Sequence, residues 1–178
     1  MADQLSAKDW LDQGLRTLAQ DGFTALKAEP LARAMGVSRG SFYWHFADVE
    51  AFHAEILNYW REIAAERIID DVEAASGKDN TLQVLLRRVF GERRALENAV
   101  RRWAVVEPAA RAAVRAIDRR RLAYVESLLR GFGIPQDVAH ARAQILYWAY
   151  LGFALSDRPL PPLQQRAVIS EMLRLASP

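Results

Sequence analysis

The segment from Leu31 to Phe46, LARAMGVSRGSFYWHF, constrains the fold more than any other part of this 178-residue chain. Its first apolar residues recur at helical spacing up to Met35, and Gly36 follows where a helix commonly ends in a left-handed residue. Ser38 can then cap a second helix by accepting a hydrogen bond from the amide of Ser41. A helix, a tight glycine-containing turn and a capped second helix predict a helix-turn-helix, whose second helix can enter a DNA major groove.

Aromatic side chains fill the second helix of this motif. Phe42 and Phe46 lie four residues apart on one helix face, so we expect them to anchor this helix to the first helix of the chain. Tyr43 and His45 then project away from that face. Trp44 has two interpretations that the sequence leaves open. It contacts DNA, along the groove wall or at a thymine methyl, or it packs on the following helix.

The first turn of the second helix is the part expected to meet base edges. Arg39, Gly40 and Ser41 occupy this turn. Arginine is the side chain best suited to bidentate contact with O6 and N7 of guanine. Glycine costs about 1 kcal/mol in a helix interior, and close approach of the backbone to DNA would compensate for it. The alternative is that Gly40 sits near the helix start, where the cost is smaller.

The residues Gly36-Val37-Ser38, Gly40-Ser41-Phe42-Tyr43 and His45-Phe46 closely resemble the signature of the TetR/AcrR family of bacterial transcriptional regulators. The resemblance covers residues 10–52 as a motif and continues beyond them only as a pattern of helices. The motif is specific, because turn, cap and aromatic order must all coincide.

The resemblance also assigns roles to individual residues. It implies that Tyr43 and His45 contact phosphates, for which a phenol hydroxyl and an imidazole N–H are suitable donors. The alternative is that both are simply surface aromatic side chains. The full set of residues expected to contact DNA is Lys27, Glu29, Ser38, Arg39, Gly40, Ser41, Tyr43, Trp44 and His45.

Two departures from the family pattern bear on DNA affinity. Where the family usually places Thr or Ser, at the start of the first helix of the motif, this chain has Lys27-Ala28-Glu29. Lys27 can reach a phosphate, whereas Glu29 repels phosphate unless it faces a base, where it can accept from N4 of cytosine. The family commonly has Lys or Arg where Val49 stands. Residues 1–50 carry five basic and seven acidic side chains, which argues against strong non-specific affinity.

The rest of the chain shows helical periodicity and no strand-type alternation. We expect an all-α fold of about nine helices, with a three-helix DNA-binding domain over residues 1–48 and a helical ligand-binding and dimerisation domain over residues 49–178. Residues 75–80 are expected to form a loop and a candidate hinge. The expected helices are 6–21, 27–35, 38–46, 48–71, 81–94, 96–106, 108–130, 135–156 and 163–175.

The helix expected over residues 135–156 predicts a subunit contact. Its segment Ile145 to Leu155 is apolar nearly all round, and such a helix must be covered on both sides. A second subunit can supply one cover, with Ala149 and Gly152 allowing close approach. Together with the helix 163–175 it would form a four-helix bundle across a homodimer, as the resemblance also implies. The alternative is that the two helices bury each other in a monomer.

The resemblance places a ligand cavity among the middle helices. Its residues favour a medium-sized, partly aromatic or apolar effector, a small molecule that the sequence does not identify. For each aromatic residue of this region the alternative is an ordinary core position. The candidate lining residues are Trp60, Phe90, Trp103, Tyr124, Tyr147 and Trp148.

The composition excludes several classes of site. The chain has no cysteine and only three histidines, which lie far apart in sequence. We therefore expect no metal site, no cofactor and no catalytic constellation. Charged side chains within residues 1–20 exclude a signal-peptide core, and the apolar stretch 145–155 is too short to span a bilayer. We expect a cytoplasmic protein.

These expectations combine into two hypotheses. The leading one is a sequence-specific, ligand-responsive repressor that binds a palindromic DNA operator as a dimer. The alternative is a dimeric helical interaction protein whose degenerate helix-turn-helix does not bind DNA.

Overall fold

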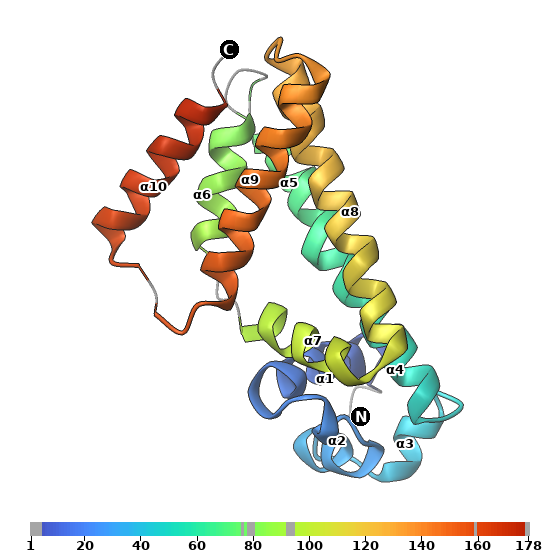
Figure 1. Ribbon diagram of the computed structural model, residues 1–178. Helices are drawn as coiled ribbons and strands as arrows, with labels where there is room; N and C mark the ends of the chain where they lie inside the picture. The colour runs from blue at the N-terminus through green and yellow to red at the C-terminus, as the bar shows by residue number, and fades with distance from the viewer. Residues whose placement is uncertain (1–4, 76, 78–80, 92–94, 159, 177–178) are drawn as a thin grey trace. The chain divides into compact units, whose positions relative to one another are not determined.

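The protein forms two compact units of helices. The structure is a computed structural model that describes residues 5–75, 77, 81–91, 95–158 and 160–176. The first unit contains residues 1–63 and 95–115, and the second contains residues 64–94 and 116–178. No strand occurs within the described ranges (Figure 1), so the expectation of an all-α fold is confirmed.

The helix bounds follow the sequence pattern closely. They are α1 (Ala7–Asp21), the 3₁₀ turn η1 (Phe23–Ala25), α2 (Ala28–Ala34), α3 (Arg39–Tyr43), α4 (Val49–Arg61), the π-helical turn η2 (Glu62–Glu66), α5 (Arg67–Ala75), α6 (Thr81–Gly91), α7 (Ala95–Val106), α8 (Pro108–Gly131), α9 (Gln136–Leu155) and α10 (Pro162–Leu175). Most of the loop expected over residues 75–80 lies outside the described residues.

The two compact units do not divide the chain at residue 48. Helices α4 and α7 pack with α1 and therefore belong to the first unit, although the sequence analysis places both in the second domain. The predicted boundary at residue 48 separates the expected DNA-binding part from the rest of the chain, and not two compact units. It stays a prediction.

The start of α3 differs from the expected cap. Ser38 does stand at the N-cap position, but its side chain makes no cap hydrogen bond. Instead, the amide of Ser41 donates to the backbone carbonyl of Ser38 at 3.0 Å. The helix is also shorter than predicted, with five residues in place of nine. In contrast, Asp48 caps α4 as expected, because its Oδ1 accepts from the amide of Ala51 at 2.7 Å.

An aromatic cluster forms the core of the first unit around α3. The Phe42 side chain is fully buried. Its ring centroid lies 5.4 Å from that of Trp10 in α1 and 5.2 Å from those of Phe46 and Phe52. Phe46 packs mainly on Phe52 of α4, at 4.9 Å. The predicted anchoring on the first helix is confirmed for Phe42, and Phe52 of α4 contacts both Phe42 and Phe46.

Helices α1 and α4 also approach each other closely at Gly14. A Cβ atom placed on Gly14 would lie 2.7 Å from Cζ of Phe52 and would collide with Ile56. A polar contact joins the same two helices, because the hydroxyl of Tyr59 donates to Oδ1 of Asp12 at 2.7 Å. The absence of a Cβ atom at Gly14 therefore allows α1 and α4 to pack this closely.

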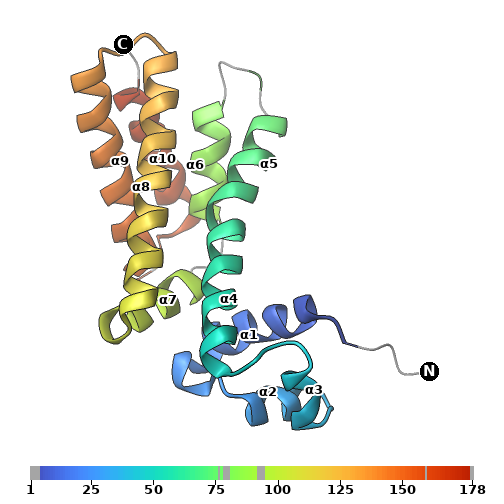
Figure 2. The ribbon, with the colours of Figure 1, turned by 90° about the vertical axis from the view of Figure 1, so that its right-hand side faces the viewer.

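The second unit is built around α6. This helix contacts α5, α9 and α10, and Figure 2 shows α5 and α6 running side by side. Phe90 of α6 stacks on Phe153 of α9 with ring centroids 4.4 Å apart. The hydroxyl of Tyr147 in α9 donates to Oδ1 of Asp118 in α8 at 2.6 Å. A mainly aliphatic core, which includes Leu82, Leu86 and Leu129, packs with these aromatic rings and holds the helices together.

The expected helix over residues 48–71 is interrupted by the π-helical turn η2. Residues 64–66 of η2 belong to the second unit, and two arginines of α8 bind them. Arg121 donates to the carbonyl of Ala64 at 3.0 and 3.2 Å, and Arg120 pairs with both carboxylate oxygens of Glu66 at 3.0 and 3.1 Å. A π turn disturbs the regular ladder of backbone hydrogen bonds, and Arg121 supplies a donor to a carbonyl within it.

None of the helices that the structure describes combines the length and the apolar composition that a membrane crossing requires.

The close approach at Gly14 gives a stability prediction. Gly14→Ala inserts a methyl group into a packed core, which typically costs about 1–3 kcal/mol and outweighs the gain in helix propensity of at most about 1 kcal/mol. We expect the free energy of unfolding, measured by chemical denaturation, to fall. Gly131→Ala, where a Cβ atom meets nothing within 4 Å, serves as the control. Equal stability of the two variants would contradict the close α1–α4 contact.

Candidate nucleic-acid interface

The turn between α2 and α3 has the geometry that its glycine predicts. Gly36 has φ = +69°, in the left-handed region. Its amide donates to the carbonyl of Arg33 at 3.2 Å, and the amide of Val37 donates to the carbonyl of Ala32 at 3.0 Å. These two bonds form the 6→1 and 5→2 pattern of a Schellman cap. The cap ends α2 and redirects the chain into α3.

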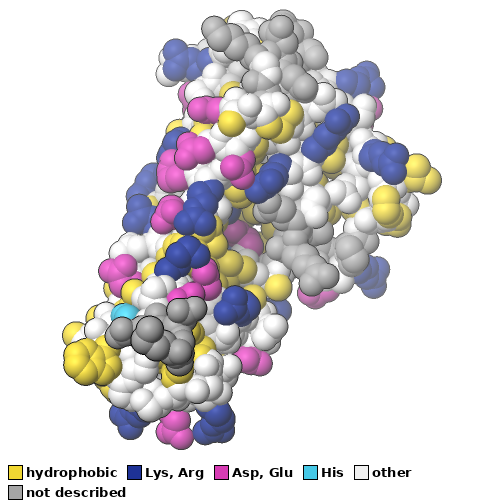
Figure 3. Space-filling view, turned by 180° about the vertical axis from the view of Figure 1, so that it is seen from behind, with side chains coloured by type: hydrophobic (Ala, Val, Ile, Leu, Met, Phe, Trp, Pro, Cys, Tyr) yellow, Lys and Arg dark blue, Asp and Glu magenta, His cyan; other side chains and the backbone are white. Residues whose placement is uncertain are grey.

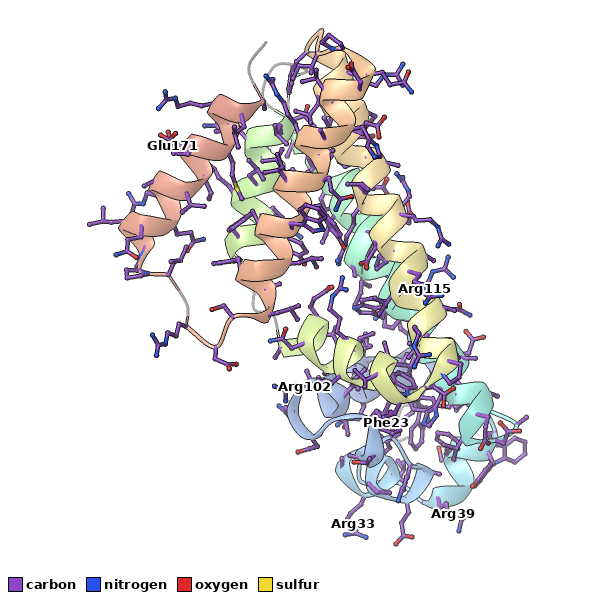
Figure 4. The ribbon with its side chains drawn as sticks, in the orientation of Figure 1. Phe23, Arg33, Arg39, Arg102, Arg115 and Glu171 are labelled. Atoms are coloured by element: carbon purple, nitrogen blue, oxygen red, sulfur yellow. The ribbon has the colours of Figure 1, made fainter. Side chains whose placement is uncertain are left out.

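Helix α3 buries Phe42, half-buries Ser41 and exposes its other residues. Phe42 is its one buried residue, whereas Tyr43 is 41% exposed and Trp44, directly after the helix, is 85% exposed. This exposure rules out packing of Trp44 on the following helix, one of the two alternatives for this residue. Figure 4 shows the labelled Arg39 at the outer end of α3, with its side chain directed away from the helices.

Arg39 and Tyr43 form a pair one turn apart on α3. Nη2 of Arg39 donates to the Tyr43 hydroxyl at 3.1 Å, and the guanidinium carbon lies 5.4 Å from the ring centroid. The pKa of the Arg39 guanidinium lies above its ordinary value, first because the Tyr43 hydroxyl accepts this hydrogen bond, and further because the Glu29 carboxylate is near. The pair presents a fixed positive charge beside a phenol hydroxyl.

Helix α2 adds an acidic and two basic side chains to this surface. Lys27 is the exposed N-cap residue of α2 and makes no side-chain cap hydrogen bond. Glu29 accepts from Nη2 of Arg33 at 3.3 Å, and both side chains are largely exposed. The hydroxyl cap that the family pattern places here is therefore absent in the structure as well as in the sequence.

His53 is a positioning residue that the sequence analysis did not single out. Its Nε2 lies 2.9 Å from the carbonyl of Leu26, directly before α2. Its ring contacts Trp103 of α7 edge-on, with centroids 5.3 Å apart, and Phe23 stacks on the same indole at 5.8 Å. His53 thus ties α4 and α7 to the segment that leads into α2. No local pattern signals a contact between residues 27 positions apart.

Gly40 has free space around it. The nearest atom to a Cβ placed on Gly40 is Oγ of Ser38 at 3.6 Å, an ordinary van der Waals contact, and φ is not positive. Packing within the chain therefore does not require glycine at position 40. Close approach of a binding partner to the backbone would explain why glycine is found there.

The structure brings the residues expected to contact DNA together on α2, α3 and the turns beside them. None of the nine is buried. Ser41 and His45 are half-buried, and the other seven are exposed: Lys27, Glu29, Ser38, Arg39, Gly40, Tyr43 and Trp44. Val49, at a position where the family has a basic residue, is half-buried in the first turn of α4.

The six aromatic residues expected to line a ligand cavity are divided between the two units. Trp60 and Trp103 are buried in the first unit. Phe90, Tyr124 and Tyr147 are buried in the second. Burial raises the pKa of the Tyr124 hydroxyl to about 12, and the nearby Glu73 carboxylate adds to this shift.

Trp148 differs from the other five, because it is 63% exposed on α9. The structure places it on a surface, together with other apolar residues of that helix. Its role in a cavity stays a prediction.

The second unit also has a surface hollow of about 590 Å³ that contains none of these aromatic residues. It is lined by Glu126, Gln136, Asp137 and His140, and Nδ1 of His140 lies 2.9 Å from Oε2 of Glu126. Among the described residues, no group of three or more His, Asp or Glu side chains is arranged to hold a metal ion.

Comparison with known proteins supports the identity of the helix-turn-helix. Residues 11–56 match the model of bacterial regulatory proteins of the tetR family. The transcriptional regulator AcrR of Shigella flexneri is 41% identical over 46 residues, which are 26% of this chain and 21% of that protein. The sequence match thus spans about a fifth of the relative.

Solved structures share the fold over nearly the whole chain. Escherichia coli NemR in its reduced form has a TM-score of 0.70 at 19% identity, with 96% of this chain and 94% of that one covered. A transcriptional regulator of Saccharomonospora viridis, solved in complex with choline, has a TM-score of 0.70 at 14% identity, with 94% and 95% covered. Residues 11–56 thus match the helix-turn-helix segment of the tetR family of bacterial regulatory proteins, and nearly the whole chain shares the fold of these solved structures.

Proposed function

We propose that this chain is a sequence-specific DNA-binding transcriptional regulator, which acts as a dimer on a palindromic operator and responds to a small-molecule effector as a repressor. One observation carries the DNA-binding part of this proposal. Phe42 fixes a five-residue helix to the core, while the side chains around it that can contact DNA remain exposed.

Helix α3 would read bases with its first turn. Arg39 is exposed and can replace its contact with the Tyr43 hydroxyl by bidentate bonds to guanine O6 and N7. Gly40, with open space around it, allows the backbone to approach a base edge or a phosphate. Trp44, which is 85% exposed, can lie along the groove wall or on a thymine methyl.

Residues before, within and after α3 would contact the DNA phosphates. The hydroxyl of Tyr43 can donate to a phosphate while it accepts from Arg39, so the pair acts as one donor group. Lys27 at the start of α2 and His45 after α3 add further donors. These contacts fix the register of α3 on the duplex without reading its sequence.

The proposed dimer rests on an exposed apolar stripe of α9. Its members recur at alternating spacings of three and four residues, the pattern of a helix seam. They are Val138, Ala141, Ile145, Trp148, Gly152 and Leu155. Helix α10 adds the exposed side chains of Leu163 and Leu175. Contiguous exposed apolar side chains of this extent mark an interaction site, and a two-fold dimer would present two α3 helices to two half-sites.

The effector would act by differential affinity. A ligand that binds one conformation of the second unit better than another shifts the population toward it. Helix α4 belongs to the first unit and continues through η2 into α5 of the second, so a change in the second unit has a covalent route to the DNA-binding helices. The choline bound to the Saccharomonospora viridis regulator is a precedent for a small-molecule ligand in this fold.

The alternative function, a dimeric interaction protein that does not bind DNA, predicts no salt-dependent affinity for any duplex. The acidic Glu29 and the missing basic residue at Val49 are the features that favour it. The exposed Arg39–Tyr43 pair favours DNA binding, and selection of duplexes from a random pool separates the two functions.

Two substitutions on α3 test the proposed division of roles. In selection from a random duplex pool at low salt, Arg39→Ala should relax the preference at one base position, with a loss on the preferred sequence of about 10- to 100-fold. Tyr43→Phe should weaken binding by a similar factor on all sequences, because a phosphate contact carries no sequence information. If both variants lost the same affinity on every duplex sequence, base reading by Arg39 would be contradicted.

Gly40 gives a test that separates folding from binding. Gly40→Ala adds a methyl group where the chain has room, so the melting temperature should stay the same or rise. If the backbone at this position approaches DNA, affinity for the selected duplex should fall at least several-fold, as measured by fluorescence anisotropy. Unchanged affinity would mean that DNA does not approach Gly40.

The apolar stripe of α9 predicts which substitutions dissociate the dimer. Ile145→Glu and Trp148→Glu place a charge on an exposed face, so each protomer should fold but remain monomeric in sedimentation equilibrium. Binding to a palindromic duplex should weaken with the loss of the second half-site contact. Ala112→Glu, at an exposed position of α8 in the first unit, is the control and should remain dimeric. A dimer that survives both α9 variants would place the interface elsewhere.

A further inference from the structure

We propose that Glu29 is an electrostatic brake on DNA affinity, an intramolecular carboxylate that is paired with Arg33 in the free protein and must give it up when DNA binds. The inference rests on the proposed DNA-binding function and adds to it a residue that opposes binding.

The first observation is the Glu29–Arg33 pair on α2. Nη2 of Arg33 lies 3.3 Å from Oε1 of Glu29, and the two side chains are 78% and 69% exposed. An ion pair so exposed contributes little to the stability of a fold. Its carboxylate is, however, positioned where it competes with any external anion for the Arg33 guanidinium.

The second observation is that the same carboxylate acts on α3. The Glu29 charge contributes to the raised pKa of Arg39, after the larger effect of the Tyr43 hydroxyl. Glu29 therefore lies near Arg39 of α3, although its ion-pair partner is Arg33 and Arg39 donates to the Tyr43 hydroxyl. Figure 4 shows the labelled Arg33 and Arg39 side chains directed outward at the same end of these helices, and Figure 3 shows an acidic side chain between two basic ones at the lower end of that view.

The way a helix-turn-helix docks on DNA explains why the Glu29 carboxylate would lower affinity. The first helix of the motif crosses the DNA backbone while the second enters the groove. An exposed carboxylate near the start of α2 then meets phosphates, and Arg33, which could neutralise a phosphate, is already paired with it. Affinity that comes from phosphate neutralisation and counterion release is lowered by the same factor on every sequence.

The test compares Glu29→Gln with the wild-type dimer on two duplexes, one enriched by selection and one of random sequence. We expect the variant to bind both duplexes more tightly at low salt, by about 5-fold, the effect of one unit charge at contact distance in water. The slope of log K against log[salt] should steepen by about 0.9, because one further phosphate is neutralised. The ratio of the two affinities should stay unchanged.

A matched control and a second variant distinguish the effect of Glu29 from a general effect of removing one negative charge. Asp71→Asn removes one negative charge from an exposed pair with Arg88, at 3.0 Å, on α5 of the second unit, and should change neither affinity nor slope. Glu29→Gln combined with Arg33→Gln should lose most of the gain, because Arg33 is the group that the substitution at Glu29 releases.

The possible outcomes separate this inference from the proposed function. An unchanged affinity of Glu29→Gln, or a gain equal to that of Asp71→Asn, would overturn the brake. A loss confined to the enriched duplex would also overturn it, and would mean that Glu29 reads a base such as cytosine through N4. If neither wild type nor variant binds DNA, the proposed function fails and the brake with it. Binding by the variant alone would support the brake.

Discussion

The buried ring of Phe42 is the contact on which the candidate DNA-binding surface depends. Helix α3 has five residues, far fewer than an isolated helix needs for stability in water. Its position is therefore set by tertiary packing, through the edge-on contacts of Phe42 with Trp10 and Phe52. The same packing decides which residues face outward. Arg39, Gly40 and Tyr43 are presented to solvent because Phe42 takes the buried face, so one aromatic contact both holds the helix and orients its functional side.

The features that the sequence predicted correctly depend on local chemistry. Gly36 adopts a positive φ because a helix that ends in a tight turn needs a left-handed residue there. Asp48 caps α4 because its carboxylate reaches an amide three residues away. Phe42 of α3 and Phe46 just after it are both buried, as their four-residue spacing predicted. In each case the predictive pattern lies within a few residues, so the local sequence contains the information.

The features that the sequence did not reveal depend on residues far apart in the chain. His53 binds the carbonyl of Leu26 across 27 positions. The π-helical turn η2 receives hydrogen bonds from Arg121, more than fifty positions away. The expected cap by the Ser38 side chain was wrong, because the backbone carbonyl accepts the amide of Ser41 instead. The high exposure of Trp148 was likewise not evident from the sequence, where the family resemblance made it a candidate lining residue of a cavity. Spacing gives the face of a helix but not the neighbour that covers it.

A crystal structure of the dimer bound to a duplex enriched from a random pool would test the central claim most directly. The account predicts that α3 of each protomer lies in a major groove, with Arg39 on base edges and Tyr43 on a phosphate. It also predicts that two-fold related half-sites lie about one helical turn or somewhat more apart. A complex in which α3 lies outside the groove, or failure of the dimer to enrich any duplex at low salt, would contradict it.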